Sequence, residues 1–385
     1  MTVTRHLVTG ATGFVGGALV LELLAADPDA EVICLVRESS REAAAIRLRR
    51  HLHRAAKLYG CGRSTLDAID ERTRAAEGDI LADRCGLNLL GLGDVDEVWH
   101  SAATLDFREE FHAEIAKQNV SGTRNVLATA QELGARVLNH VSTAYVAGAR
   151  MEVISEAAPL DVTDSNNAYE RSKIEAENVV AASGFPARIL RPGIVIGHGR
   201  TYAATGTTGV YSFIRDLQTL TVQVERSLGK LLRHRALRVR AVGNAALNLI
   251  PVDVVAATAV ALSLRTAPAM AYHLTNSTPP TVSTVTAVVC EELGIRPMAL
   301  MNSADGFSGI DERFDTDPRT RFFHPYVMQR REFQTQNVEA ILGSEALRYP
   351  MPEECWRMFV RWYLSELAAE RSTNRSRRNT FLRAG

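Results

Sequence analysis

The segment that most constrains the fold of this chain is TGATGFVG, which spans residues 9–16 and places glycines at positions 10, 13 and 16. It directly follows an apolar run and opens a helical pattern. A glycine loop in this setting allows a sharp turn, a close approach of backbone to a pyrophosphate, and tight packing of helix on strand. Free N–H groups at the start of such a helix attract phosphate. We therefore predict a dinucleotide site here, formed by Gly10, Thr12, Gly13, Phe14 and Gly16.

The first half of the chain alternates short β-branched runs with helical patterns. The predicted strands are Arg5–Thr9, Glu31–Val36, Val95–Ser101, Arg136–Ser142 and Ala187–Arg191. The predicted helices are Phe14–Ala26, Arg41–Tyr59, Phe111–Leu133 and Ala168–Ala182. Apolar strands separated by helices indicate a parallel sheet that is covered on both faces. With right-handed crossovers, this predicts an α/β fold with a Rossmann-type, doubly wound parallel sheet.

The pattern loosens after the predicted nucleotide-binding core, which we place at residues 1–200. For residues 201–370 we predict a smaller, mostly helical subdomain that binds substrate, with some strands returning to the core sheet. Its predicted elements are a helix within 201–231, a strand and helix within 247–264, a strand within 268–280, a helix over 282–293, an irregular polar stretch at 302–325 and an amphipathic helix over 352–369.

Global charge and cysteine content exclude several classes of protein. The chain has 44 Lys and Arg against 44 Asp and Glu, so no overall charge draws it to nucleic acid or to an anionic membrane. No apolar run approaches the ~20 residues that span a bilayer, and the N-terminus lacks the pattern of a signal peptide. The five cysteines are scattered without CxxC pairing, which predicts no disulfide and no metal site. We expect a cytoplasmic protein.

Two local stretches are strongly basic. The run RSLGKLLRHRALRVR at 226–240 is compatible with a solvated surface helix, or with a site for an acidic carrier protein or a pantetheine phosphate. The tail at 371–385 holds five arginines, and we expect it to be disordered.

The end of the second predicted strand indicates which dinucleotide binds. The strand VICLV is followed by Arg37, where an acidic residue would favour NAD and an arginine accommodates the 2′-phosphate of NADP. Arg47 on the next helix is a second candidate for that phosphate, or a solvated position. Glu38 lies next to Arg37 and opposes the preference. The prediction is NADP(H).

Further cofactor contacts are expected at the ends of the next two strands. Asp79 and Ile80, in the segment GDI, are candidates for the adenine, although an aspartate here also caps turns. Ser101, Ala102 and Ala103 follow the strand that ends at His100. Their small side chains let the backbone approach a cofactor, or pack closely in the core.

The segment YERSK places Tyr169 and Lys173 four residues apart in a helical pattern. Residues at this spacing share one helix face, so the phenol and the ammonium group can enter one cleft. A nearby positive charge lowers the pKa of a tyrosine and makes it a better proton donor at neutral pH. The pair therefore predicts a proton-transfer site, because it occurs downstream of a phosphate loop.

TGATGFVG, the YxxxK pair and Asn119 in NVSGT together resemble the extended short-chain dehydrogenase/reductase superfamily. The chain is most similar to its thioester reductase and fatty acyl reductase branch. The segments that carry this resemblance are CLVR, VWHSAATLDF, QNVSGTRNVL, HVSTAYVAG, AYERSKIEAENVV, RPGIVIGHGRT and LNLIPVDVVA, within roughly residues 5–260. Tyr202 stands where relatives often have glycine.

The resemblance implies roles for individual residues. Tyr169 would be the acid, Lys173 its tuner and a ribose ligand, and Thr143 the hydroxyl on the substrate oxygen. Thr143 rather than Ser142 is indicated by counting back from Gly148. Asn119 would be structural or relay protons. A further two residues, Pro192 and Gly193, would border the nicotinamide.

The resemblance implies an NADPH-dependent reductase that converts an acyl thioester on CoA or a carrier protein to an aldehyde, or on to the alcohol, in a biosynthetic pathway. No carrier or synthetase module precedes the motifs, so we expect the acyl group to be presented in trans. Two alternatives stay open. One is an extended dehydrogenase or epimerase that acts on a sugar nucleotide, a steroid-like alcohol or a ketone. The other is a non-catalytic NADP-binding sensor, which the presence of Thr143, Tyr169 and Lys173 opposes.

Overall fold

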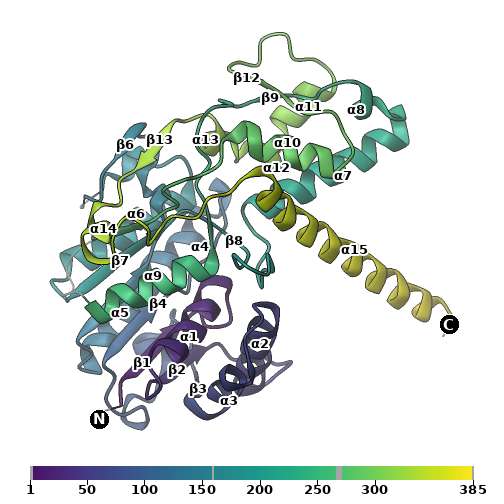
Figure 1. Ribbon diagram of the computed structural model, residues 1–385. Coiled ribbons are helices and arrows are strands. Elements are labelled where there is room, and N and C mark those ends of the chain that lie inside the picture. Colours follow the sequence, from purple (N-terminus) through teal and green to yellow (C-terminus); the bar gives the residue numbers. More distant parts are fainter. Residues whose placement is uncertain (1–2, 158–159, 266–270, 384–385) are drawn as a thin grey trace. The chain divides into compact units, whose positions relative to one another are not determined.

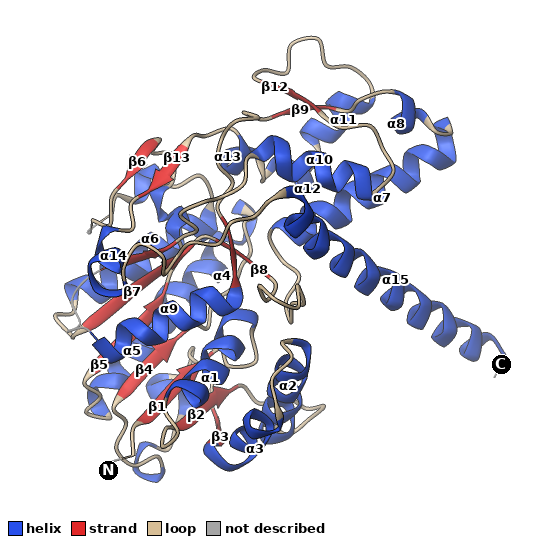
Figure 2. Ribbon diagram, in the orientation of Figure 1, coloured by secondary structure: helices blue, strands red, loops and turns tan. Residues whose placement is uncertain are grey.

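Seven parallel strands form the central sheet, in the order β11-β7-β5-β4-β1-β2-β3 (Figures 1 and 2). The computed structural model describes residues 3–157, 160–265 and 271–383, with side chains as far as residue 372. The strands are β1 Arg5–Thr9, β2 Glu31–Val36, β3 Thr73–Glu77, β4 Glu97–His100, β5 Val137–Val141, β7 Ala187–Pro192 and β11 Ala271–Leu274. The strand order reverses next to β1, which is the doubly wound arrangement. The predicted α/β, Rossmann-type fold is confirmed.

Helices cover both faces of this sheet because alternate side chains of each strand point to opposite sides. Val8 belongs to a core cluster with residues of α1, α2 and α9. The adjacent Leu7 belongs to a second cluster, with residues of α5 and α6. The covering helices are α1 Phe14–Ala26, α2 Ala44–Leu58 and α9 Val252–Arg265 on one face, and α5 Gly122–Glu132 and α6 Ala168–Ala182 on the other.

The chain divides into two compact units. Unit 1 contains the sheet and comprises Met1–Gly206, Asn248–Thr278 and Arg331–Tyr349. Two stretches beyond residue 200 therefore belong to the unit that contains the sheet, and the first of them contains α9 and β11. The remaining elements of unit 1 are α3 Arg63–Arg72, α4 His112–Ala116, β6 Glu152–Ile154, β8 Ile194–Ile196, β10 Leu249–Pro251, β13 Arg331–Phe333 and α14 Gln336–Leu342.

Unit 2 comprises Thr207–Leu247, Pro279–Arg330 and Pro350–Gly385. Its core forms where α15 packs on α10, and the indole nitrogen of Trp356 donates to the carbonyl of Val285 over 3.1 Å. Trp356, Phe359 and Tyr363 are buried, as their helical spacing indicates. The elements are α7 Val210–Leu228, α8 Leu231–His234, β9 Arg238–Arg240, α10 Val282–Glu292, β12 Ala299–Met301, α11 Ile310–Thr316, α12 Pro318–Arg321, α13 His324–Val327 and α15 Glu353–Arg383.

The structure differs from the sequence-based expectation in several places. The stretch 302–325, predicted to be irregular, contains helices α11 and α12. Strand β3 and helix α3 were not predicted, because β3 is only partly buried and lacks a continuous apolar run. The predicted helix Phe111–Leu133 is interrupted by a π-helical turn at Lys117–Ser121. The basic tail, expected to be disordered, continues α15 as far as Arg383. A helix that is already nucleated extends easily through a stretch without proline or glycine.

A buried ion pair joins helix α6 to strand β7. Glu177 and Arg191 are each 1% exposed, and Arg191 donates to the carboxylate from Nη2 over 2.7 Å and from Nε over 3.0 Å. A second bond runs from Arg191 Nη2 to the carbonyl of Ala157. This geometry satisfies both charges away from water.

Replacing Glu177 by glutamine should destabilise the protein strongly, because it leaves the Arg191 charge buried without its counterion. We expect a loss of about 3–5 kcal/mol in the free energy of unfolding, measured by urea denaturation. Asp67→Asn is the matched control, since its i,i+4 pair with Arg63 is exposed and should contribute less than about 1 kcal/mol. Equal midpoints for the two variants would contradict the assignment.

Candidate active site

The loop between β1 and α1 is compact enough to exclude side chains at two glycines. Gly10 has φ +75°, and a Cβ there would lie 2.7 Å from the amide nitrogen of Ala102. A Cβ on Gly16 would collide with the carbonyl oxygen of Gly10. Gly13 caps α1 without any side-chain hydrogen bond, so the first turn presents its N–H groups and its positive dipole end uncapped. Thr12 and Phe14 lie in this loop, half-buried. The cradle fits the pyrophosphate of a dinucleotide.

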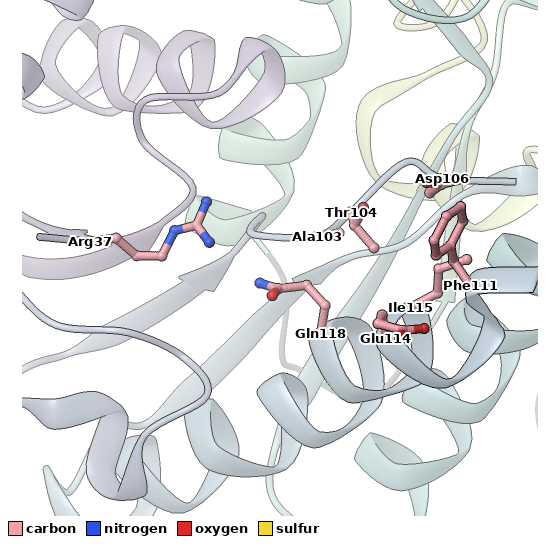
Figure 3. A pocket seen from close by; sticks show the side chains of 8 residues that line it. All are labelled: Arg37, Ala103, Thr104, Asp106, Phe111, Glu114, Ile115 and Gln118. Carbon is pink, nitrogen blue, oxygen red and sulfur yellow. The ribbon is translucent and has the colours of Figure 1, made fainter. Parts of the chain in front are cut away.

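Two arginines contact one another after the end of β2. Arg37 is exposed, and Figure 3 shows it pointing toward the side chain of Gln118. Arg47 in the first turn of α2 donates from Nη2 to the carbonyl of Arg37 over 2.6 Å. The Nε of Arg47 is buried and has no hydrogen-bond partner among the described residues. The donor of Arg47 that lacks a partner fits a phosphorylated ribose.

Arg37 lines a cavity of about 340 Å³. It is lined by Arg37, Ala103, Thr104, Asp106, Phe111, Glu114, Ile115 and Gln118 (Figure 3). The predicted cofactor residue Ala103 therefore lies in the same cavity as Arg37. Arg37 follows β2 and Ala103 comes after β4, the two strands on either side of β1, at the carboxyl ends where doubly wound folds bind their ligands.

Asp79 and Ile80 occupy the turn after β3. The Asp79 carboxylate accepts the N–H of Leu81 over 3.0 Å. This is the turn-capping interaction that was one of the two roles considered for Asp79 from the sequence. The side chain of Ile80 is buried in the core cluster, and its carbonyl accepts Nδ2 of Asn125. The side chain of Ile80 therefore contributes to the packing of the core.

His100 organises the loops at the end of β4. The hydroxyl of Thr123 donates to the carbonyl of Asn119 over 2.6 Å, so it must accept a proton from Nε2 of His100, which lies 3.0 Å away. Nδ1 of His100 then accepts the hydroxyl of Thr9 over 2.8 Å, and Thr9 accepts the N–H of Ala102. Burial, followed by the charge of Lys173, lowers the pKa of His100 to about 3. A neutral imidazole in one tautomer thus connects β1 to the segment that contains Ser101, Ala102 and Ala103.

Helix α6 positions Tyr169 and Lys173. Asn167 caps the helix by accepting the N–H of Glu170 over 2.9 Å. Lys173 is 3% exposed, and its ammonium group donates to the carbonyl of Val141, at the end of β5, over 2.7 Å. Burial lowers the pKa of Lys173 to about 8, while the negative charge of Glu177, one turn along, raises it.

Tyr169 is 8% exposed, and the ring of Phe107 contacts it edge-on with centroids 5.1 Å apart. Burial, followed by the charge of Glu170, raises the pKa of Tyr169 above its ordinary value. The sequence-based expectation that Lys173 lowers this pKa is wrong for the structure described, because desolvation of the phenolate dominates. Tyr169 is therefore protonated at neutral pH. Phe107 carried no signal in the sequence that marked it as a neighbour of this tyrosine.

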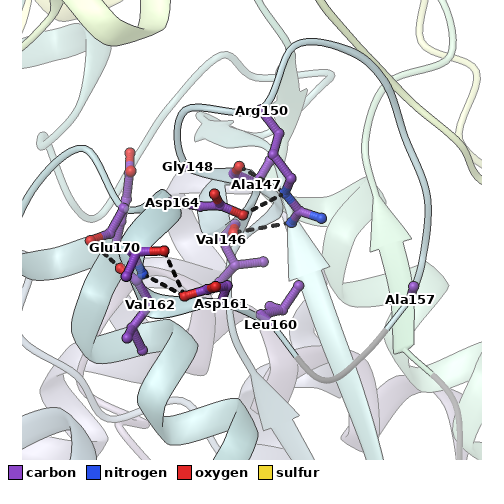
Figure 4. A network of polar contacts seen from close by, with 12 residues as sticks. Val146, Ala147, Gly148, Arg150, Ala157, Leu160, Asp161, Val162, Asp164 and Glu170 are labelled. Carbon is purple, nitrogen blue, oxygen red and sulfur yellow. Dashed lines mark hydrogen bonds and ion pairs between the residues drawn. The ribbon is translucent and has the colours of Figure 1, made fainter.

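Thr143 begins the turn after β5. Its hydroxyl accepts the N–H of Tyr145 over 3.2 Å, and the residue is 6% exposed. The turn is held from outside by Arg150, which donates to the carbonyl of Ala147 and pairs with Asp164 at 3.5 Å (Figure 4). Gly148 has φ +58°, and a Cβ there would collide with the carbonyl of Asp164.

Asn119 lies in the π-helical turn and is 2% exposed. Its side chain exchanges two hydrogen bonds with the backbone of Thr104, at 2.8 and 3.1 Å, and donates to the hydroxyl of Ser172 over 2.9 Å. Ser172 precedes Lys173. Asn119 therefore ties the loop after β4 to helix α6.

Pro192 ends β7, and Gly193 follows it. A Cβ on Gly193 would lie 2.8 Å from the carbonyl oxygen of Asn248, so the close approach of β10 requires glycine. Tyr202 has φ +63°, the left-handed region that favours glycine. In the described part of the chain, no three His, Cys, Asp or Glu side chains are grouped to hold a metal ion. No helix among the described residues is long and apolar enough to cross a membrane.

Residues 8–259 match the model of the male sterility protein family. The chain belongs to this family. It is an NAD(P)-dependent oxidoreductase of the extended short-chain dehydrogenase/reductase type. Its cofactor is thus a nicotinamide dinucleotide, and the glycine cradle described above fits one.

The chain is also similar to individual curated proteins. It is 32% identical to an isonitrile lipopeptide synthase of Streptomyces coeruleorubidus, over 56% of this chain and 15% of the synthase. It is 34% identical to a probable fatty acyl-CoA reductase of Arabidopsis thaliana, over 39% of this chain and 32% of the reductase. The chain thus spans less than a third of the length of either curated relative.

A solved structure matches nearly the whole chain. The terminal R domain of the myxalamid PKS-NRPS biosynthetic pathway superposes with a TM-score of 0.74 and 25% identity, over 96% of this chain and 92% of that domain. The likeness therefore includes both units and not only the nucleotide-binding sheet.

We expect the rate of this oxidoreductase to fall as pH rises through about 8, because the Lys173 ammonium loses its proton there. The pKa of Lys173 is lowered, so the charged form exists below about 8 and is lost above it. The measurement is kcat/KM for the nicotinamide cofactor against pH, which reports ionisations of the free enzyme. Lys173→Met should be less active and lack this alkaline limb. A wild-type profile that stays flat to about pH 10, the ordinary range for lysine, would refute the role.

Proposed function

We propose that this chain reduces an acyl thioester, carried by CoA or by a carrier protein, to an aldehyde with NADPH. The observation that carries the proposal is the match of both units to a terminal R domain, together with a buried Tyr169, Lys173 and Thr143 at the carboxyl end of β5 and the start of α6. The curated relatives include a fatty acyl-CoA reductase and a lipopeptide synthase, which supports a thioester as the substrate class.

In the proposed reaction Tyr169 is the acid. When bound, the cofactor supplies a hydride to the carbonyl carbon of the thioester. Tyr169 gives its proton to the carbonyl oxygen, and the hydroxyl of Thr143 donates a hydrogen bond to the same oxygen. The resulting hemithioacetal loses its hydroxyl proton as the carbon–sulfur bond breaks, and the departing sulfur takes up a proton, which releases an aldehyde and a thiol. Burial raises the pKa of Tyr169, so the phenol is protonated when the substrate arrives, and the Lys173 ammonium on the same helix face would stabilise the phenolate that forms when the proton leaves.

Lys173 and Asn119 support that acid. The Lys173 ammonium lies on the same helix face as Tyr169, where it would hold a cofactor ribose beside the phenol. Asn119 fixes the segment that precedes Lys173 through Ser172, which supports a structural role. We place the acyl group in the region 201–370, outside the predicted nucleotide-binding core of 1–200.

The preference for NADP(H) is proposed from Arg37 and Arg47. Both guanidinium groups lie after the end of β2, and the buried Nε of Arg47 has no partner among the described residues. A 2′-phosphate would supply an acceptor for both groups. Pro192, Gly193, Ser101, Ala102 and Ala103 are proposed to border the rest of the cofactor.

Arg37→Asp should shift the cofactor preference. Removing one charge-assisted hydrogen bond costs about 1.5–3 kcal/mol, which raises KM for NADPH roughly 10- to 100-fold while KM for NADH changes little. Arg54→Asp, at an exposed position on the same helix as Arg47, is the charge-matched control. Equal losses with both cofactors would argue against a 2′-phosphate site.

Tyr169→Phe should reduce kcat by about 10²- to 10⁴-fold and leave the Kd for NADPH unchanged, because only the proton donor is removed. The assay follows NADPH oxidation with octanoyl-CoA, and mass spectrometry identifies octanal or octanol. A variant with near-normal turnover would remove Tyr169 from the mechanism. Turnover of an aldehyde or a sugar nucleotide, with none of the thioester, would favour the alternative dehydrogenase instead. Binding of NADPH without turnover of any of them would favour the sensor.

A further inference from the structure

Unit 2 carries a group of exposed cations around the end of α7, helix α8 and the turn after α10. Arg226, Lys230, Arg233 and Arg296 are all exposed, and we call these four residues the basic patch. Arg233 pairs with Glu225 at 2.9 Å, which ties α8 to the end of α7. Arg296 donates to the carbonyl of His234 over 3.3 Å, which brings the turn after α10 to the same place.

The acidic groups near this patch are already paired: Glu225 with Arg233 of the patch, and two aspartates with arginines outside it. Asp311 accepts hydrogen bonds from Arg235, including one from Nη1 over 2.9 Å, and Asp315 accepts from Arg240 over 2.8 Å. Residues 226–240 contain six Lys and Arg and no Asp or Glu. Within the part of the chain that the structure describes, Arg226 and Lys230 have no ion-pair partner. Their charge is therefore available to a partner molecule.

An exposed apolar side chain lies among these cations. Leu228 is 60% exposed and is followed by Gly229 with φ +62°, where the chain leaves α7. A leucine surrounded by charges has the composition of a protein interface, with an apolar centre and a polar rim. A binding site for a free phosphate does not need such a residue. A surface for nucleic acid would place aromatic side chains where bases stack, and this stretch of sequence contains none.

We propose that the basic patch and Leu228 dock the acidic face of the acyl carrier protein that delivers the substrate. This inference rests on the proposed function, because it names the partner that carries the thioester. Complementary charge raises the rate of encounter by about 10- to 1000-fold and lowers KM at low salt, without entering the chemical step. The small thioester alone would not use the surface.

The test compares three forms of one acyl group: an octanoyl acyl carrier protein, octanoyl-CoA and octanoyl-pantetheine. The variant is Arg226→Glu with Lys230→Glu, and kcat/KM for each thioester is measured at low salt with saturating NADPH. We expect kcat/KM for the carrier to fall at least tenfold and kcat/KM for octanoyl-pantetheine to stay unchanged. Added salt should reduce the difference between wild type and variant, because the charges are screened. Leu228→Ala should weaken the carrier reaction without this salt dependence.

The control variant is Lys57→Glu with Arg265→Glu, which reverses two exposed charges in unit 1 and should leave all three reactions unchanged. Equal rates of wild type and patch variant with the carrier would overturn the proposal. A loss with octanoyl-CoA and the carrier alike would overturn it in favour of a phosphate site. Tight, salt-sensitive binding of duplex DNA by wild type but not by the variant would overturn it in favour of nucleic acid.

Binding of the fluorescently labelled carrier, followed by anisotropy, separates failure of the inference from failure of the proposed function. If wild type binds the carrier more tightly than the patch variant but reduces no thioester, the docking surface is supported and the reductase function is contradicted. If wild type reduces octanoyl-pantetheine but binds the carrier no better than the variant does, the reductase function is supported and the docking surface is contradicted.

Discussion

The ammonium group of Lys173 carries a positive charge into the interior of unit 1, and the groups around it are arranged to accommodate that charge. A buried ammonium must be hydrogen-bonded, and the carbonyl of Val141 accepts it. Glu177 raises the pKa of Lys173 and is itself balanced by Arg191 at a fully buried ion pair. His100 is held neutral close by, since burial and the lysine both lower its pKa. The cation persists because these titratable neighbours are either neutral or paired.

The same requirement for satisfied polar groups connects the loops at the strand ends. Thr9, which precedes the phosphate loop, is bonded to His100 at the end of β4. His100 is bonded through Thr123 to the backbone of Asn119, and the side chain of Asn119 reaches Ser172 on the helix that carries Lys173. A change at any member of this series leaves a buried donor or acceptor unpaired, which costs about 1–3 kcal/mol. A continuous series of hydrogen bonds therefore connects the phosphate loop to helix α6 although they are far apart in the sequence.

The sequence allowed the sheet and the phosphate loop to be predicted because both depend on local pattern. Gly10 and Gly16 indicate close approaches of the backbone, and in the structure a Cβ on either residue would collide with neighbouring backbone atoms. The pKa of Tyr169 was predicted in the wrong direction, since it depends on burial by residues such as Phe107 that have no fixed spacing from it. Strand β3 was not predicted, because a strand at the edge of a sheet need not be apolar. The docking role proposed for the basic patch and Leu228 needed the ion pairs, which show which cations of the run 226–240 are not neutralised.

The opposite pKa shifts of Tyr169 and Lys173 bear on how the proton is transferred. Burial favours the neutral form of each group, so the tyrosine keeps its proton while the lysine approaches neutrality near pH 8. Reduction of a carbonyl consumes a proton and uses Tyr169 as a phenol, the form that the buried site stabilises. Giving up that proton leaves a buried phenolate, whose formation the same burial opposes, so in the proposed mechanism the Lys173 ammonium on the same helix face would stabilise it. In the proposed mechanism Tyr169 therefore starts as the phenol, and the Lys173 ammonium, which is charged below about pH 8, offsets the cost of the phenolate that proton transfer leaves behind.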